Sequence, residues 1–528
     1  MIAARSLLKS GFTLSILTMA SRILGLVREM TKAALMGTTA LSDAFSVAFL
    51  IPNLFRRLFA EGSISVAFIP TFKTYLLNND TEKTKEFLCC IWTFISFFVS
   101  IVVGIGILCT PHIVKLFGLE AFDETVVLTR IMFPFLLFIS IAAFFQGILN
   151  SVHIFLPSGL APILLNIVTI ACSWLLGPYT QNPARAMAIG ILIGGFLEAA
   201  VQLPSVLKNK FTFRMTSLIR ALKNPGTKSV LRLIGPTIIG MAAYQLNDLV
   251  STALAAGAGE GVVSSLQYSL RLQELILGVF AVSIGTVLLP ELTEHAKAAN
   301  WKLYHSRLAG AIDVITLITI PVTFFSLVCG DSIVRLLFQS KAFDEQSVLL
   351  TNQVFMFHIT GIFFIALNRI LAPAFYAQSD SVTPTIAGII SFAVNIILAA
   401  ILSGPHKGSG IAAALSISGA VNTAMLFIFL KRKSGETSIV HTLLGGFFYI
   451  CKMIVFSTVA IAPVFIFKDY VYSFFKQLHP ENKLIYLILP LAVFLFVFLL
   501  IQFVLLKTSN DKNIIVLLNM LTRKKIKK

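Results

Sequence analysis

Apolar residues run along this chain in long stretches, and polar residues gather in short intervals between them. A transmembrane helix needs about 20 predominantly apolar residues to cross the hydrocarbon core of a bilayer. Fourteen stretches have this character, and they lack the regular alternation of a membrane β-strand. The predicted spans are residues 10–36, 44–72, 87–111, 126–150, 158–178, 185–206, 230–256, 262–290, 308–330, 347–376, 383–403, 410–430, 444–467 and 484–506.

The composition supports an all-α polytopic membrane protein. Of the 528 residues 57% are apolar and 12% charged, with a mean hydropathy of +0.88, which lies outside the range of soluble domains. The N-terminus starts basic and then apolar, as secretory signal peptides do. However, Arg22 follows the apolar run, no small-residue cleavage site appears, and the apolar pattern resumes. We therefore expect an uncleaved first span.

The net charge of +18 would suggest a nucleic-acid partner in a soluble protein. Here the basic residues collect in alternate loops. The loop around 207–229 has no acidic residue, Lys431–Lys433 follow a later span, and the chain ends in TRKKIKK. The intervening loops are poor in lysine and arginine. By the positive-inside rule, both termini are expected in the cytoplasm, with the basic loops attracted to anionic membrane lipids. No nucleic-acid partner is expected.

A repeated segment divides the chain into two halves. Residues 113–129, IVKLFGLEAFDETVVLT, return as 333–351, IVRLLFQSKAFDEQSVLLT, and the offset of about 220 also pairs Pro70 with Pro290 and Pro162 with Pro384. Six spans is an even number, so both halves enter from one side and form a parallel repeat. The predicted domains are an N-lobe 1–206, a basic cytoplasmic linker 207–229, a C-lobe 230–432, two extra spans within 444–507 and a basic tail 508–528.

The second span carries charges where charge is expensive. An ionised side chain at the centre of a membrane helix costs roughly 2.5 to 3.5 kcal/mol. The stretch DAFSVAFLIPNLFRRLFAEG contains Asp43, Arg56, Arg57 and Glu61. On one continuous helix Asp43, Arg57 and Glu61 share a face, while Arg56 points about 100° away.

Two further spans add arginines. Arg22 and Arg28 lie either side of Gly25; a continuous helix would splay them, whereas a bend at Gly25 would let both face a cavity. Arg271 and Glu274 have i,i+3 spacing. Internal ion pairs are one interpretation: Arg57 with Glu61, Arg271 with Glu274, and Asp43 with a first-span arginine. Basic charge remains in excess, however, and the guanidinium fork suits phosphate oxygens. An anionic, phosphate-bearing substrate is the second interpretation.

Five motifs carry a resemblance to a known family. They are SRILGLVRE at 21–29, DAFSVAFLIPNLFRRLFAEGSISVAFIP at 43–70, GILNS at 147–151, APILLNI at 161–167 and LAPAFYAQSDSVTP at 371–384. With these motifs the chain closely resembles, over nearly its whole length, the bacterial lipid II flippases of the MurJ/MviN family in the MOP exporter superfamily. The resemblance implies two six-helix lobes plus an extra pair. It also implies translocation of the undecaprenyl-pyrophosphate-linked disaccharide-pentapeptide from the inner to the outer leaflet of the cytoplasmic membrane.

The resemblance further implies a substrate-binding central cavity. Its candidate residues here are Arg22, Arg28, Asp43, Arg56, Arg57, Glu61, Arg271 and Glu274. A position that is often acidic in the family is Leu270, so an extra carboxylate there is absent. By the resemblance, the last two spans are expected to form a groove for the lipid tail. Their apolar composition permits this role, as would the composition of any lipid-facing helix. The cell-wall synthesis or division machinery is a candidate partner, and the internal pseudosymmetry makes a monomer sufficient.

No cofactor or metal is expected, and no enzyme activity. The cysteines and histidines are scattered, and His358 is interpreted as a hydrogen-bonded packing residue. No Walker A sequence is present, and GAGEG at 257–261 is interpreted as a tight loop. Membrane potential or an ion gradient is the expected driving force. Asp248 with Asn247 is the candidate ion-coupling site, and an internal hydrogen-bonded cluster is the alternative for these two residues.

Three rival functions stay open at this point. A MATE-like drug or cation antiporter would need carboxylates and aromatic residues in its cavity, and it would leave two spans unexplained. Another polyprenyl-pyrophosphate-glycan flippase is chemically closer, and only the motifs speak against it. A membrane enzyme would need a shared reaction centre, but about 27 Å of helix rise separates Asp43 from Glu61.

Overall fold

The computed structural model describes residues 2–58, 65–434, 437–478 and 482–515, and within them the chain forms helices and no strand. The chain divides into two compact units. The first unit comprises residues 1–267 and 340–343, and the second comprises 268–339 and 344–528. The protein is therefore an all-α, multi-pass membrane protein, as its hydropathy predicts.

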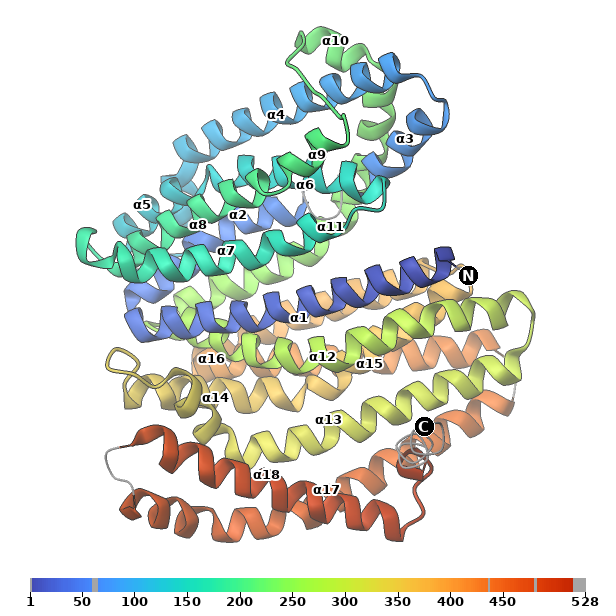
Figure 1. Cartoon of the computed structure of the whole chain (residues 1–528). Coiled ribbons are helices and arrows are strands. Elements are labelled where there is room, and N and C mark those ends of the chain that lie inside the picture. Colours follow the sequence, from blue (N-terminus) through green and yellow to red (C-terminus); the bar gives the residue numbers. More distant parts are fainter. Residues whose placement is uncertain (1, 59–64, 435–436, 479–481, 516–528) are drawn as a thin grey trace. The chain divides into compact units, whose positions relative to one another are not determined.

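The helices of the first unit follow the apolar stretches (Figure 1). They are α1 (Ile2–Met36), α2 (Ala40–Arg56), α3 (Ser65–Leu77), α4 (Thr81–Lys115), α5 (Phe122–Met132), α6 (Phe135–Ser151), α7 (Leu156–Leu175), the 3-10 turn η2 (Gly177–Tyr179), α8 (Pro183–Ala200), α9 (Leu203–Lys208), α10 (Leu218–Lys223) and α11 (Pro225–Gly257). The next helix, α12 (Val262–Lys297), begins in this unit and continues in the second.

Aromatic packing holds the first unit together and fastens the basic linker to it. Phe68 stacks on Phe72 and on Phe87 and meets Phe144 edge-on, all four being buried. The linker residue Phe213 packs against Trp92, with ring centroids 4.7 Å apart. The linker between α9 and α10 is thus anchored along α4 by apolar contact.

The second unit contains the rest of α12 and six further helices (Figure 1). They are α13 (Trp301–Phe338), α14 (Glu345–Thr360), α15 (Ile362–Ala377), α16 (Val382–Ser434), α17 (Thr437–Leu478) and α18 (Lys483–Thr508). Helices α14 and α15 are bent by 41° at a short break. Helix α16 contains a non-helical residue, Lys407, so it comprises two helical segments that match the predicted spans 383–403 and 410–430.

The described helices agree with the predicted spans. Eight of them are long and apolar enough to cross a membrane, or nine with α14 and α15 taken as one bent span. The count of fourteen is consistent with this but stays a prediction. The span expected at 44–72 is described as two helices, α2 and α3, with residues 59–64 outside the described chain.

The repeated AFDE motif has a similar setting in both halves. Its first copy precedes and opens α5, and its second precedes and opens α14. In each copy the glutamate pairs with an arginine: Glu124 with Arg185 at 2.7 Å, and Glu345 with Arg335. The domain boundaries drawn from the repeat stay a prediction, and this local likeness supports them.

The two extra spans, α17 and α18, pack on α13. Phe325 of α13 contacts Phe498 of α18 inside a small apolar cluster that also contains Ile461 of α17. At one end of the pair, Lys452 donates to the buried Asp511 carboxylate at 2.8 Å. The predicted basic tail is described only as far as residue 515.

Candidate functional site

Arg57 lies at the C-terminal end of α2, where it contacts α11. Its Nη1 donates to Oε1 of Gln245 at 3.3 Å and approaches Oδ2 of Asp248 at 3.5 Å. Both distances are long for hydrogen bonds to a charged group, for which about 2.8 Å is usual. Arg57 and Asp248 are about equally exposed, at 31% and 30% of their side-chain surface. Among the described residues, the guanidinium of Arg57 is therefore held loosely, through one of its nitrogens.

This geometry changes the interpretation of Asp248. Asp248 was a candidate ion-coupling residue, with an internal hydrogen-bonded cluster as the alternative. The structure places its carboxylate beside Arg57, and Gln245 one turn earlier on α11 binds the same guanidinium nitrogen. Asn247 lies on the same helix, and its side chain is half-buried. The cluster interpretation thus describes the observed contacts, and ion coupling stays a prediction.

Asp43 lies at the other end of α2 and is buried. Its Oδ2 accepts from the amide of Gly261 and its Oδ1 from the amide of Ser264, each at 2.7 Å. These amides belong to the first turn of α12, whose helix dipole favours an anion at that position. Asp43 therefore caps α12 and does not pair with a first-span arginine, as one interpretation had it.

The GAGEG segment forms the tight turn that brings these amides to Asp43. Gly259 and Gly261 have φ values of +131° and +78°, which a side chain would strain. Glu260 in the same turn accepts from the amide of Ala40 at 2.8 Å. The start of α12 is thus capped by Asp43 of α2, and the start of α2 is capped by Glu260 in the turn before α12. The expectation of a tight loop is confirmed.

Helix α1 holds Arg22 and Arg28 without a break at Gly25. Six residues on a continuous helix place the two side chains about 120° apart, so they splay. Arg28 is buried, forms an ion pair with Glu29 at 2.9 Å, and lies 5.5 Å from the ring of Phe49. Arg22 is half-buried, and no ion pair of its guanidinium occurs within the described chain.

Lys32 is a basic residue that the sequence reasoning missed. It lies one turn after Arg28, is buried, and donates from Nζ to Oγ of Ser46 on α2 at 2.6 Å. Glu29 lies 4.0 Å from it. The i,i+4 spacing to Arg28 was a usable signal, because it places both cations on one face of α1. Helices α1 and α2 therefore carry more buried basic side chains than the motifs alone indicate.

The remaining candidates are placed as follows. Arg56 donates from Nε to Oδ1 of Asn53 at 2.8 Å and so bonds within its own helix. In the second unit Arg271 pairs with Glu274 at 3.0 Å, which confirms the pair expected from their spacing. Glu61 lies outside the described residues. The described chain contains no group of three or more potential metal ligands.

Comparison with known proteins identifies close relatives. A family model described as "Lipid II flippase MurJ" matches residues 32–485. A "Probable lipid II flippase MurJ" of Treponema pallidum is 46% identical over 96% of this chain and 97% of its own length. A protein of the same description from Vibrio cholerae is 33% identical over 80% of this chain and 83% of its own.

Solved structures show the same fold. One titled "Lipid II flippase MurJ, inward closed conformation" superposes with a TM-score of 0.77 at 24% identity, covering 94% of this chain and 99% of that one. An inward-facing multidrug resistance MATE transporter of the MOP superfamily gives a TM-score of 0.64 at 14% identity, covering 78% and 94%. At these identities the likeness concerns the fold. From the family match and the sequence relatives, the chain belongs to the lipid II flippase MurJ family.

Proposed function

We propose that this protein moves lipid II, the undecaprenyl-pyrophosphate-linked disaccharide-pentapeptide, from the inner to the outer leaflet of the cytoplasmic membrane by alternating access. Membership of the family supports the substrate. The observation that carries the chemistry is Arg57, an arginine at the end of a membrane helix whose contacts within the described chain are long and involve a single guanidinium nitrogen. We assign the N–H donors on the other guanidinium nitrogens to an anion.

The pyrophosphate is the part of this substrate that arginines recognise. A guanidinium binds phosphate oxygens through two parallel hydrogen bonds and stays protonated at any physiological pH. We assign this role to Arg22, Arg28, Arg57 and Arg271, with Arg56, Glu61 and Glu274 as further candidate substrate-binding residues. Asp43 contributes by fixing the start of α12, and Asp248 by holding Arg57 until an anion replaces it.

The proposed transport needs no covalent step and no cofactor. The membrane potential, negative inside, favours outward movement of an anion by about 2.3 kcal/mol per charge per 100 mV. The potential therefore drives the pyrophosphate in the direction of transport, provided that the positively charged arginines do not move across the membrane together with it. An ion gradient acting at Asp248 is the alternative driving force.

The proposed arrangement in the membrane follows the sequence. Both termini and the linker 207–229 are cytoplasmic, 1–206 and 230–432 are the two lobes, and α17 with α18 accommodates the lipid tail. One copy of the chain contains both lobes, so a monomer is sufficient for the proposed transport. A drug or cation antiporter shares the fold but would bind cations, which the basic side chains of α1 and α2 disfavour.

The test is the leaflet distribution of lipid-linked peptidoglycan precursor in cells depleted of this protein. Wild type is expected to restore outward exposure, and Arg57→Ala is expected to fail at equal abundance in the membrane. Arg130→Ala is the matched control, because Arg130 is exposed on α5 and donates to a main-chain carbonyl at 3.3 Å. Persistent outward exposure after depletion, with no second flippase in the strain, would contradict the proposal.

A further inference from the structure

His358 is a buried imidazole at the end of α14, just before the break between α14 and α15. Its Nδ1 lies 2.6 Å from Oγ of Ser269 on α12. Its main-chain carbonyl accepts from Nε2 of Gln273 at 2.5 Å. One residue therefore binds α12 twice, through its ring and through its backbone. This confirms His358 as a hydrogen-bonded residue and identifies α12 as the helix to which it is bonded.

Three main-chain carbonyls next to the break accept hydrogen bonds from other helices. Helix α14 ends at Thr360 and α15 begins at Ile362, and the amide of Gly361 between them donates to the carbonyl of His358 at 3.2 Å, three residues back rather than four. Other helices supply donors: Ser416 of α16 binds the carbonyl of Phe357 at 2.6 Å, and Thr323 of α13 reaches that of Ile359 at 3.4 Å. Gln273 of α12 completes this set at His358. The break is thus a fixed structure held from three sides.

The bond of Ser269 joins two helices, whereas many buried hydroxyls in this protein bond within their own helix. Ser140, Ser173 and Thr110 donate to the carbonyl four residues earlier in their own helices. Ser265, one turn before Ser269 on the same helix, bonds to Val262. Ser269 instead meets another helix, so it transmits the position of α14 to α12.

The cost of a buried imidazole supports a positional role. Nε2 of His358 is buried without a hydrogen-bond partner among the described residues. A buried polar atom left unsatisfied costs free energy. An apolar side chain of similar size would avoid that cost, so packing alone does not account for the histidine.

Helix geometry connects this contact to Arg271. Ser269 and Gln273 are one turn apart and share a face, whereas Arg271, two residues from each, projects about 160° away. We propose that His358 is a positioning residue for Arg271: by holding Ser269 and Gln273 it fixes the rotation of α12 that presents Arg271 and Glu274. The proposal rests on the function proposed above, because Arg271 is assigned to the pyrophosphate there.

The test compares two probes that share the same lipid tail and differ in the pyrophosphate group. Affinities of the purified full-length protein are measured for undecaprenyl pyrophosphate and for undecaprenol, which has the same tail without phosphate. Ser269→Ala and His358→Leu are expected to weaken pyrophosphate binding about five-fold, as for the loss of one buried hydrogen bond. Undecaprenol binding is expected to stay unchanged. In His358→Asn the side-chain amide can take the place of Nδ1. This variant is expected to keep the wild-type preference for undecaprenyl pyrophosphate over undecaprenol.

Matched controls separate positioning from folding. Ser265→Ala removes a buried hydroxyl from the same helix face, and it is expected to leave both affinities at the wild-type level. Gln273→Met removes the other bond to His358 and replaces Ser269→Ala if that variant does not fold. Equal losses in Ser265→Ala and Ser269→Ala, or an unchanged preference in Ser269→Ala, would overturn the proposal. A wild-type protein without preference for the pyrophosphate would instead contradict the proposed function.

Discussion

The charged side chains of α2 are compensated in three different ways. Asp43 uses main-chain amides of α12, Arg56 uses an amide oxygen in its own helix, and Arg57 uses a glutamine and a carboxylate of α11. A carboxylate that accepts two short bonds at a helix start is strongly stabilised. Arg57, with its longer contacts, is the least stabilised of the three and the one best suited to bind a substrate anion.

The capping role of Asp43 leads to a prediction about stability. Asp43→Asn keeps one acceptor but loses the charge and the second oxygen, so one amide of the α12 start is left without its bond. We expect the free energy of unfolding to fall by about 1 to 3 kcal/mol, the cost of a buried donor left unsatisfied. Denaturant unfolding of the purified protein in detergent measures this change.

Asp123→Asn is the control for this prediction. Asp123 lies in the first turn of α5, in the same unit, but is exposed. Its substitution is expected to change the free energy of unfolding by less than about 0.5 kcal/mol, as for most surface sites. A change at Asp43 no larger than that at Asp123 would rule out the capping role.

The candidate site was predictable from the sequence only where its contacts are local. Arg271 and Glu274 are three residues apart, and helical spacing alone predicts their pair. The partners of Asp43 and Arg57 lie 188 to 221 residues away. Hydropathy predicts that such segments are helices but contains no information on which helix ends meet, so these contacts appeared only in the structure.

At the scale of whole elements, the apolar stretches predicted helix positions well but missed their interruptions. The stretch 347–376 reads as one span, yet it contains the break between α14 and α15. A side chain at Gly361 would lie 2.4 Å from Oγ of Ser416, so the close approach of α16 requires glycine there. Because Ser416 is distant in sequence, the need for this glycine is not visible in the apolar pattern.

The start of α4 gives a prediction of pH dependence. Asp80 is the N-cap, and its side chain accepts from the amide of Lys83 at 3.0 Å. This hydrogen bond, together with the Lys83 ammonium, lowers the pKa of Asp80 below its ordinary value of 3.8. A lowered pKa in the folded state means that the cap stabilises α4 fully above about pH 4 and that this is lost as the pH falls through the folded-state pKa.

Hydrogen exchange at the Lys83 amide measures this cap. Protection, corrected for the intrinsic exchange rate, is expected to decline below about pH 4 in the wild type. Asp80→Asn still offers an oxygen to the amide but does not ionise, so its protection is expected to be weaker and independent of pH. The same pH profile in both proteins would show that another group is responsible.

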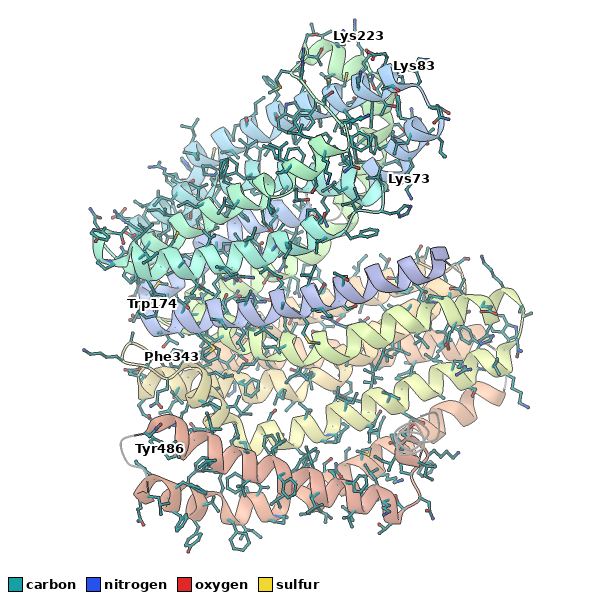
Figure 2. The ribbon with its side chains drawn as sticks, in the orientation of Figure 1. Lys73, Lys83, Trp174, Lys223, Phe343 and Tyr486 are labelled. Atoms are coloured by element: carbon teal, nitrogen blue, oxygen red, sulfur yellow. The ribbon has the colours of Figure 1, made fainter. Side chains whose placement is uncertain are left out.

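At the scale of the whole molecule, the distribution of charge predicts the orientation in the membrane. Figure 2 shows Lys73, Lys83 and Lys223 at one end of the first unit and Trp174 at the other. Trp174 is 55% exposed, as suits an aromatic residue at a membrane interface. Helix α9, which leads into the basic linker, and helix α10 within the linker contain no acidic residue. The positive-inside rule therefore predicts that the lysine-bearing end faces the cytoplasm.

Cysteine labelling tests this orientation in cells. Gln181 and Asn209 are both exposed and lie on either side of α8, so they should face opposite sides of the membrane. In a cysteine-free background, Gln181→Cys is expected to react with a membrane-impermeant maleimide in intact cells, and Asn209→Cys only after permeabilisation. The cysteine-free parent, which must still support growth and stay unlabelled, is the control. The reverse pattern would place the basic linker outside, and the potential would then oppose the proposed movement of the pyrophosphate.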